Sequence, residues 1–187
     1  MARLGLIRHA QVTIDPRVPA DQWPLSQEGI KAAAALLRNP VLAEVQLVYT
    51  SPEPKAVATA AAIFGRQPII QVPELKELDR TAAGWLSTKA EYEAMVAEIF
   101  RRPDESIRGC EPAALAQQRI VHAIERLVAA HPVCPLAVIS HGIVLALYMC
   151  HLKSIVMPDL AIWRRIGFPD LAVVDAVQRV VIVDFHG

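Results

Sequence analysis

The sequence lacks the features that mark secreted, membrane-spanning and zinc-binding proteins. Its only cysteines are Cys110, Cys134 and Cys150, and no two of them form a CxxC pair, so neither a disulfide framework nor a zinc knuckle is predicted. The longest later apolar run, around residues 143–150, is well below membrane-spanning length. The apolar stretch at the N-terminus is interrupted by Arg8 and is too short for the core of a signal peptide. We therefore expect a cytoplasmic protein without a membrane partner.

The chain also lacks an excess of charge of either sign. Lys plus Arg number 19 and Asp plus Glu number 19, so the formal net charge is zero. A neutral chain has no overall field to hold nucleic acid, although it can still contain a local basic pocket. Repeats, low-complexity tracts and linkers are missing too. We expect a single domain over residues 1–187, with a small helical cover from about residue 79 to residue 112.

What the chain does contain is a regular alternation of short apolar runs and amphipathic segments. The predicted strands are residues 4–7, 45–49, 68–72, 136–139, 172–175 and 179–183. The predicted helices are residues 27–38, 52–64, 87–102, 113–131 and 142–151. This alternation predicts an α/β fold. We expect a three-layer sandwich in which helices cover both faces of a mostly parallel central sheet with an antiparallel C-terminal strand.

Sequence signals also mark where the first two helices begin. Ser26 is expected to cap the first helix, which ends at Asn39-Pro40. Ser51 is expected to cap the second helix, with Pro52 at its first helical position.

Charged and imidazole side chains follow the predicted strands at the points where the strands end. Arg8 and His9 follow the first strand, Lys55 the second, Glu77 the third and His141 the fourth. Ligands of open α/β sheets collect beyond the carboxyl ends of the strands. We therefore expect two histidines, two cations and a carboxylate to meet at one edge of the sheet.

This set of side chains is what phosphoryl transfer requires. Arg8 offers a fork of N–H donors to phosphoryl oxygens and Lys55 a point charge. The helices that begin after Ser51 and at Gly142 add free N–H groups at the same edge. A neutral imidazole can attack phosphorus and carry the group as phosphohistidine. A carboxylic acid can protonate the leaving alkoxide and then accept a proton from water. No metal or other cofactor is needed if the cations supply the positive charge.

Five segments of the chain resemble, in the same order, the motifs of the histidine phosphatase superfamily, also called phosphoglycerate mutase-like. They are residues 6–10, 25–29, 51–60, 75–77 followed by 84–85, and 138–142. The resemblance implies that His9 is the nucleophile, that Arg8 and His141 belong to the phosphate pocket, and that Glu77 is the acid and base. It covers nearly the whole chain.

Three positions depart from the motifs of that family. Lys55 stands where the family has its second arginine, which keeps the charge but loses the bidentate fork. Ala10 replaces the glycine that follows the first histidine. Asp15 falls where many members have a polar residue, usually asparagine, and a carboxylate there would disfavour a phosphate.

The predicted site contains catalytic and phosphate-binding residues and no metal ligands. The catalytic candidates are His9, Glu77 and His141, and the phosphate-binding candidates are Arg8, Lys55, Gln11 and Gly142. Gln11 can hydrogen-bond a phosphate oxygen or simply be solvated. The choice of acid is open among Glu74, Glu77 and Asp79, since any of the three can face the pocket.

We predict a metal-independent phosphoric monoester hydrolase that takes a small phosphorylated metabolite and releases inorganic phosphate. The alternatives are a phosphoglycerate-type mutase, a phosphohistidine-protein phosphatase and a pseudoenzyme that binds a phosphate ligand. The modest cover favours hydrolysis over a mutase because water is less excluded. The protein-phosphatase branch of the family lacks much of a cover, whereas we expect this chain to have one. The features that favour a pseudoenzyme are Lys55 and Ala10. The oligomeric state is left open.

Overall fold

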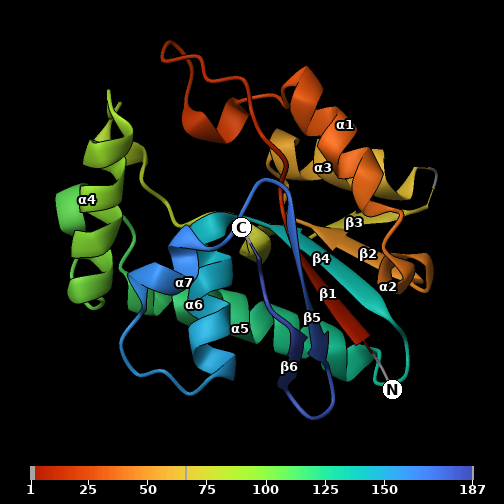
Figure 1. Cartoon of the computed structure of the whole chain (residues 1–187). Helices are drawn as coiled ribbons and strands as arrows, with labels where there is room; N and C mark the ends of the chain where they lie inside the picture. The colour runs from red at the N-terminus through yellow and green to blue at the C-terminus, as the bar shows by residue number, and fades with distance from the viewer. Residues whose placement is uncertain (1–2, 66, 187) are drawn as a thin grey trace.

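The central sheet has six strands (Figure 1). The computed structural model describes residues 3–65 and 67–186. Residues 1, 2, 66 and 187 of the predicted domain lie outside this part. The strands are β1 (Arg3–Arg8), β2 (Leu47–Thr50), β3 (Ile69–Gln71), β4 (Leu136–Ser140), β5 (Asp170–Asp175) and β6 (Val180–Val183), in the order β3-β2-β4-β1-β5-β6. The first four are parallel, β5 is antiparallel to β1, and β6 is antiparallel to β5. The predicted sheet is therefore confirmed.

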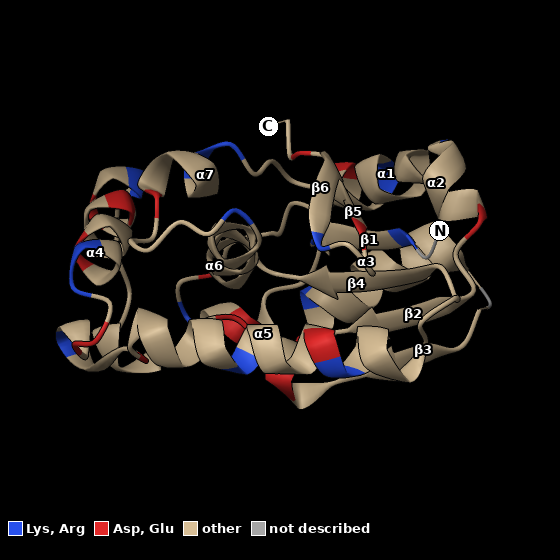
Figure 2. Cartoon of the chain, turned by 90° about the horizontal axis from the view of Figure 1, so that it is seen from below, with Lys and Arg blue, Asp and Glu red and all other residues tan. Residues whose placement is uncertain are grey.

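Alternating side chains give this sheet two apolar faces. On β1, Leu4 and Leu6 join the core cluster that contains α5 (Ala113–Ala130) and α6 (Gly142–Leu152). Ile7 belongs to the opposite cluster, with α1 (Gln27–Leu36) and α3 (Pro54–Phe64). In Figure 2 α5 lies on one side of the sheet, and α1 and α2 (Pro40–Ala43) lie on the other. Both α5 and α4 (Lys89–Arg101) carry charges of both signs. The three-layer sandwich with helices on both faces is confirmed.

Helix α1 (Gln27–Leu36) begins where the sequence predicts it. The Ser26 side chain accepts a hydrogen bond from the Gly29 N–H at 3.0 Å. A Cβ atom at Gly29 would lie 2.2 Å from the carbonyl oxygen of Gln11, so α1 packs directly on the segment that follows β1. The short helix α2 (Pro40–Ala43), capped by Asn39, was not predicted, because four residues are too few to show helical periodicity.

The predicted start of α3 (Pro54–Phe64) is wrong by two residues. Its first residue is Pro54 and not Pro52, and its N-cap is Glu53, which makes no side-chain cap. Two prolines stand two positions apart, and either could occupy the first turn. The predicted cap, Ser51, instead accepts a hydrogen bond from the Glu53 N–H at 3.2 Å and contacts His141.

The remaining elements lie around the carboxyl ends of the parallel strands. They are η1 (Ala20–Gln22), η2 (Pro73–Leu75), η3 (Thr81–Ala83), α4 (Lys89–Arg101), η4 (Ile107–Gly109) and α7 (Leu160–Arg164). Thr88 and Glu91 form a capping box that starts α4. Figure 1 shows α4 at the side of the molecule, beyond α6 and α7. Within residues 3–65 and 67–186, no helix is long and apolar enough to cross a membrane.

Candidate active site

The structure brings Arg8, His9, Lys55 and His141 together at one edge of the sheet. Arg8 ends β1, His141 directly follows β4, and Lys55 lies in the first turn of α3, just after β2. Because β4 lies between β1 and β2 in the sheet, these chain segments end side by side. All four residues are at most 7% exposed, which is unusual for charged and imidazole groups without a function.

The backbone fixes the tautomer of His9. Its Nδ1 lies 2.8 Å from the carbonyl oxygen of Ala10, and a carbonyl can only accept, so Nδ1 carries the proton. The lone pair is therefore on Nε2, the atom that attack on phosphorus would use. Burial and the neighbouring Arg8 lower the pKa of His9 to about 3, which keeps the ring neutral near pH 7.

The Arg8 guanidinium is held between a loop and a helix start. It donates to the carbonyl oxygen of Ile166, and its Cζ lies 3.4 Å from the centroid of the Phe168 ring. Its Nε is buried and has no partner among residues 3–65 and 67–186. Burial lowers the pKa of Arg8 to about 10, so it stays charged at neutral pH. A Cβ atom at Gly142 would lie 2.8 Å from the same guanidinium. Gly142 therefore contributes the space in which Arg8 lies.

His141 is fully buried, and its ring centroid lies 5.1 Å from that of His9. Its Nε2 lies 2.7 Å from Oγ of Ser51, while its Nδ1 is buried and has no partner in the described part of the chain. Burial, followed by the nearby His9 and Lys55, lowers the pKa of His141. Unpartnered buried nitrogens on both Arg8 and His141 indicate that this pocket is built to receive an acceptor-rich group.

Glu53 is a residue of this cluster that sequence reasoning missed. Its carboxylate lies 2.6 Å from Nζ of Lys55 and 3.3 Å from Nε2 of His141, and it accepts the Glu77 N–H at 2.8 Å. Lys55 also donates to the carbonyl oxygen of Ala20 at 2.8 Å. Glu53 stands between two prolines just before Lys55, and that position was the signal that could have identified it.

The structure distinguishes among the three candidate acids. Glu77 reaches the start of α6, where its carboxylate accepts the N–H groups of Ile143 and Val144 at 3.1 Å each. Burial raises the pKa of Glu77, against the effect of these hydrogen bonds. Glu74 instead pairs with Arg126 on the surface, and Asp79 is exposed and bonds to Thr81.

Gln11 does not join the group. Its side chain is exposed, and it lies outside the linings of both cavities that contain the other candidates. The physical reason is local: the backbone carbonyl of Gln11 accepts the Ser26 N–H at 2.9 Å, so the chain turns toward α1 directly after Ala10. Asp15 also lies outside the linings of both cavities, and it pairs with Arg17 at 2.7 Å.

Two connected cavities meet at these residues. The histidine chamber, of about 850 Å³, contains Arg8, His9, Glu77 and His141 in its walls. The side chamber, of about 680 Å³, is lined by Glu53 and by segments of residues 16–23 and 76–85. Both chambers share Ala20, Trp23, Lys55, Glu77, Arg80 and Trp85.

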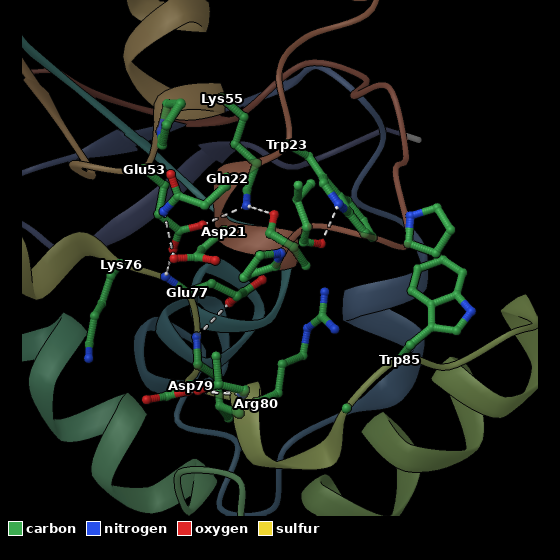
Figure 3. A pocket seen from close by; sticks show the side chains of 18 of the residues that line it. Asp21, Gln22, Trp23, Glu53, Lys55, Lys76, Glu77, Asp79, Arg80 and Trp85 are labelled. Atoms are coloured by element: carbon green, nitrogen blue, oxygen red, sulfur yellow. Dashed lines mark hydrogen bonds and ion pairs between the residues drawn. The ribbon is translucent and has the colours of Figure 1, made fainter.

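Figure 3 shows how the side chains of the side chamber are arranged. Lys55, Glu53 and Glu77 lie close together, the rings of Trp23 and Trp85 stand on the opposite side, and Arg80 extends between the two groups. Over the described part of the chain, His, Cys, Asp and Glu side chains form no cluster of three that could hold a metal ion.

Comparisons with known proteins agree with this architecture. The family model of the histidine phosphatase superfamily (branch 1) matches residues 4–177. No curated protein matches the sequence. Among solved structures, YhfR of Bacillus stearothermophilus is 24% identical, with a TM-score of 0.80 over 100% of this chain and 98% of that one.

Two further structures carry the names of phosphatases. Phosphoserine phosphatase from Entamoeba histolytica, in complex with 3-phosphoglyceric acid, is 17% identical, with a TM-score of 0.77 over 100% of this chain and 98% of its own. The mycobacterial glucosyl-3-phosphoglycerate phosphatase is 19% identical, with a TM-score of 0.76 over 100% of both chains. These likenesses concern the fold, whereas the family match concerns the sequence over nearly its whole length. The predicted class, a phosphoric monoester hydrolase, is supported, and the chain belongs to the histidine phosphatase superfamily (branch 1).

Proposed function

We propose that this protein is a metal-independent phosphatase that hydrolyses the phosphomonoester of a small metabolite through a phosphohistidine on His9. The observation that carries the proposal is the His9 tautomer. The hydrogen bond from Nδ1 to the Ala10 carbonyl leaves Nε2 unprotonated in a pocket whose other groups include Arg8, Lys55 and His141. A neutral imidazole with a fixed lone pair beside buried cations is the arrangement that attack on a phosphate ester needs.

The reaction proceeds in two displacements. In the first, Nε2 of His9 forms a bond to phosphorus, the phosphorus–oxygen bond to the alcohol breaks, and the Glu77 carboxyl gives its proton to the leaving oxygen. In the second, the Glu77 carboxylate takes a proton from water, the resulting hydroxide attacks phosphorus, and the phosphorus–nitrogen bond breaks. Inorganic phosphate leaves, and His9 and Glu77 return to their starting states.

The cations of the pocket stabilise the charge on the phosphoryl oxygens in both steps. Among the described residues, Nε of Arg8 and Nδ1 of His141 have no partner. Arg8 can donate to one oxygen, and neutral His141 can donate to another from Nδ1 when the Ser51 hydroxyl donates to its Nε2. Lys55 uses two of its three N–H groups on Glu53 and Ala20, which leaves the third for a phosphoryl oxygen. The names of the phosphatases to which the fold is similar support the same reaction class.

Hydrolysis of p-nitrophenyl phosphate in the presence of EDTA tests this function. We expect wild type to release phosphate, and His9→Ala to lose at least about a thousandfold in kcat because the covalent step is removed. The exposed His186→Ala is the matched control and should retain activity. Quenching wild type in alkali should trap a phosphohistidine. Turnover that persists in His9→Ala would overturn the proposal.

Three further measurements separate the alternatives. A mutase would interconvert phosphoglycerate isomers faster than it releases phosphate. A phosphohistidine-protein phosphatase would prefer a phosphorylated protein to every small ester. A pseudoenzyme would bind phosphate esters in calorimetry and release none.

A further inference from the structure

Aromatic residues are few in this chain, and they gather at the histidine chamber. The sequence has three tryptophans, three tyrosines and four phenylalanines. All three tryptophans line the chamber, together with one tyrosine and one phenylalanine: Trp23, Trp85, Trp163, Tyr92 and Phe168. They come from five separate places in the chain, so no single element brings them together.

Core packing accounts for Trp163 and Tyr92, which belong to or contact the main core cluster, but not for the other rings. Trp85 is 50% exposed and Phe168 is 47% exposed, although large aromatic side chains are stabilised chiefly by burial. Exposed apolar surface gathered in a concave site, rather than scattered singly, is typical of a ligand-binding wall.

The rings are held in fixed positions rather than left loose. The indole of Trp23 donates to the carbonyl oxygen of Asp15 at 2.9 Å and meets Trp85 edge-on, with 5.9 Å between the ring centroids. In Figure 3 both rings stand across the pocket from Lys55 and Glu77. Phe168 lies 5.4 Å from the His9 ring, centroid to centroid. The aromatic wall therefore begins beside the proposed nucleophile and continues outward, where the alcohol part of a bound ester would lie.

Most of the polar side chains on this wall are already bonded to one another. Ser87 and Thr88 are engaged with Glu91 in the cap of α4. Glu93 pairs with Arg164 at 3.1 Å and with Lys89 at 3.6 Å. Nε1 of Trp163 is a buried donor of this wall without a partner among the described residues. A polyhydroxylated alcohol would find few others, whereas a flat apolar group would find ring faces.

We infer that the substrate is the phosphate ester of an alcohol that carries a planar apolar group, and that this group binds against the aromatic wall of Trp23, Trp85, Tyr92, Trp163 and Phe168. The inference rests on the proposed phosphatase function, since it describes the leaving group of that reaction. The guanidinium of Arg80 packs on the Tyr92 ring, with Cζ 4.9 Å from the ring centroid, and so restrains this part of the wall.

A matched pair of primary-alcohol esters tests the inference without a difference in leaving-group chemistry. We expect kcat/KM for 2-phenylethyl phosphate to exceed that for glycerol 1-phosphate by about tenfold or more, because the ring is transferred from water to the wall. Trp85→Ala should bring this ratio close to one. A merely structural role of Trp85 would lower both values equally and leave the ratio unchanged. Leu115→Ala on α5, where Leu115 is 55% exposed, is the control and should change neither value.

Binding provides a second readout that does not depend on turnover. Because all three tryptophans line the chamber, 3-phenylpropylphosphonate should quench the intrinsic fluorescence and bind at least about tenfold tighter than propylphosphonate. The inference would be overturned if the two esters had equal kcat/KM and the two phosphonates had equal affinity. If turnover still depended on His9, the phosphatase function would stand. Tighter binding of the phenyl compound without any turnover would support the ligand class and overturn the phosphatase function.

Discussion

Lys55 occupies the position at which the superfamily's second motif has an arginine, and its surroundings suit an ammonium group. Nζ binds two oxygens of the protein, the Glu53 carboxylate and the Ala20 carbonyl. Lysine is a compact point charge, whereas arginine would need a wider, planar arrangement of acceptors. Glu53 and the Ala20 carbonyl thus hold the ammonium group of Lys55 in place, and both Glu53 and Lys55 matter to the charge of the pocket.

Lys55→Ala should weaken phosphate binding and the fold together. It removes a cation from the pocket and leaves the Glu53 carboxylate, with a side chain that is 12% exposed, without its main partner. We expect Ki for inorganic phosphate to rise by about tenfold or more, and the free energy of unfolding to fall by about 3 kcal/mol. Inhibition kinetics and urea denaturation measure the two effects. Lys153→Ala, which breaks an ion pair with Asp184 far from the pocket, is the control.

Glu53→Gln should move the pH dependence of the reaction. The Glu53 charge contributes to the raised pKa of Glu77, although burial is the larger cause. The amide keeps the shape of Glu53 and removes its charge, so the pKa of Glu77 should fall. The acid form of Glu77 is then lost at lower pH, and the descending limb of log kcat/KM against pH should shift toward lower pH. A limb that stays in place, or moves upward, would contradict the role of Glu77 as the acid.

At the scale of elements, the start of α6 forms part of the phosphate pocket because its first residue has no side chain. Gly142→Ala would place a Cβ atom 2.8 Å from Cζ of Arg8. That atom belongs to the end of a flexible side chain, so we expect Arg8 to shift while the fold is retained. A misplacement of this size should lower kcat/KM by about a hundredfold.

Gly5→Ala on β1 is the matched control for this change. A Cβ atom there would meet its nearest neighbour, the Leu42 side chain, at an ordinary contact distance of 3.5 Å. Activity should therefore change little. Equal losses in the two variants would show that the effect of Gly142→Ala is not specific to Arg8.

Elements with a clear period were predictable from the sequence, and those fixed by tertiary contacts were not. The apolar runs that became β1 and β4 and the helices α5 and α6 lie close to where the pattern indicates. The start of α3 was misassigned because the Ser51 side chain bonds to His141, which lies in a distant segment. Local helix propensity does not take account of such a contact. The same limit applies to the site: strand ends indicated His9 and His141, and the place of Glu53 beside Lys55 was a local signal, but its contact with the distant His141 was not predictable from the local sequence.

At the scale of the whole molecule, the buried histidines couple stability to pH. The folded-state pKa of His9 is lowered from 6.5 to about 3, so between these values the unfolded chain binds more protons than the folded chain. Its contribution to stability is therefore complete above about pH 6.5 and is lost as the pH falls. His141 acts in the same direction, whereas the raised pKa of Glu77 favours the folded state at low pH.

His9→Gln should remove the part of this pH dependence that belongs to His9. Between about pH 7 and about pH 5, wild type should lose about 2 kcal/mol more of its free energy of unfolding than the variant does. Urea denaturation at the two pH values measures the difference. The exposed His186→Gln should behave as wild type does. An identical loss in His9→Gln and wild type would mean that His9 is not held neutral in the fold.

The position of β4 between β1 and β2 has a consequence for the order in which the protein is made. On the ribosome, β1 and β2 emerge long before β4. The later strand joins them, because Leu136 of β4 pairs with both Leu4 and Leu47. Until then each of these two strands has an open edge, and such edges bind other chains readily. A nascent chain that stops before β4 already carries Arg8 and Lys55 but has no phosphate pocket. The pocket therefore forms late, after His141 has arrived between residues synthesised much earlier and after Ile166 and Phe168 have followed to contact Arg8.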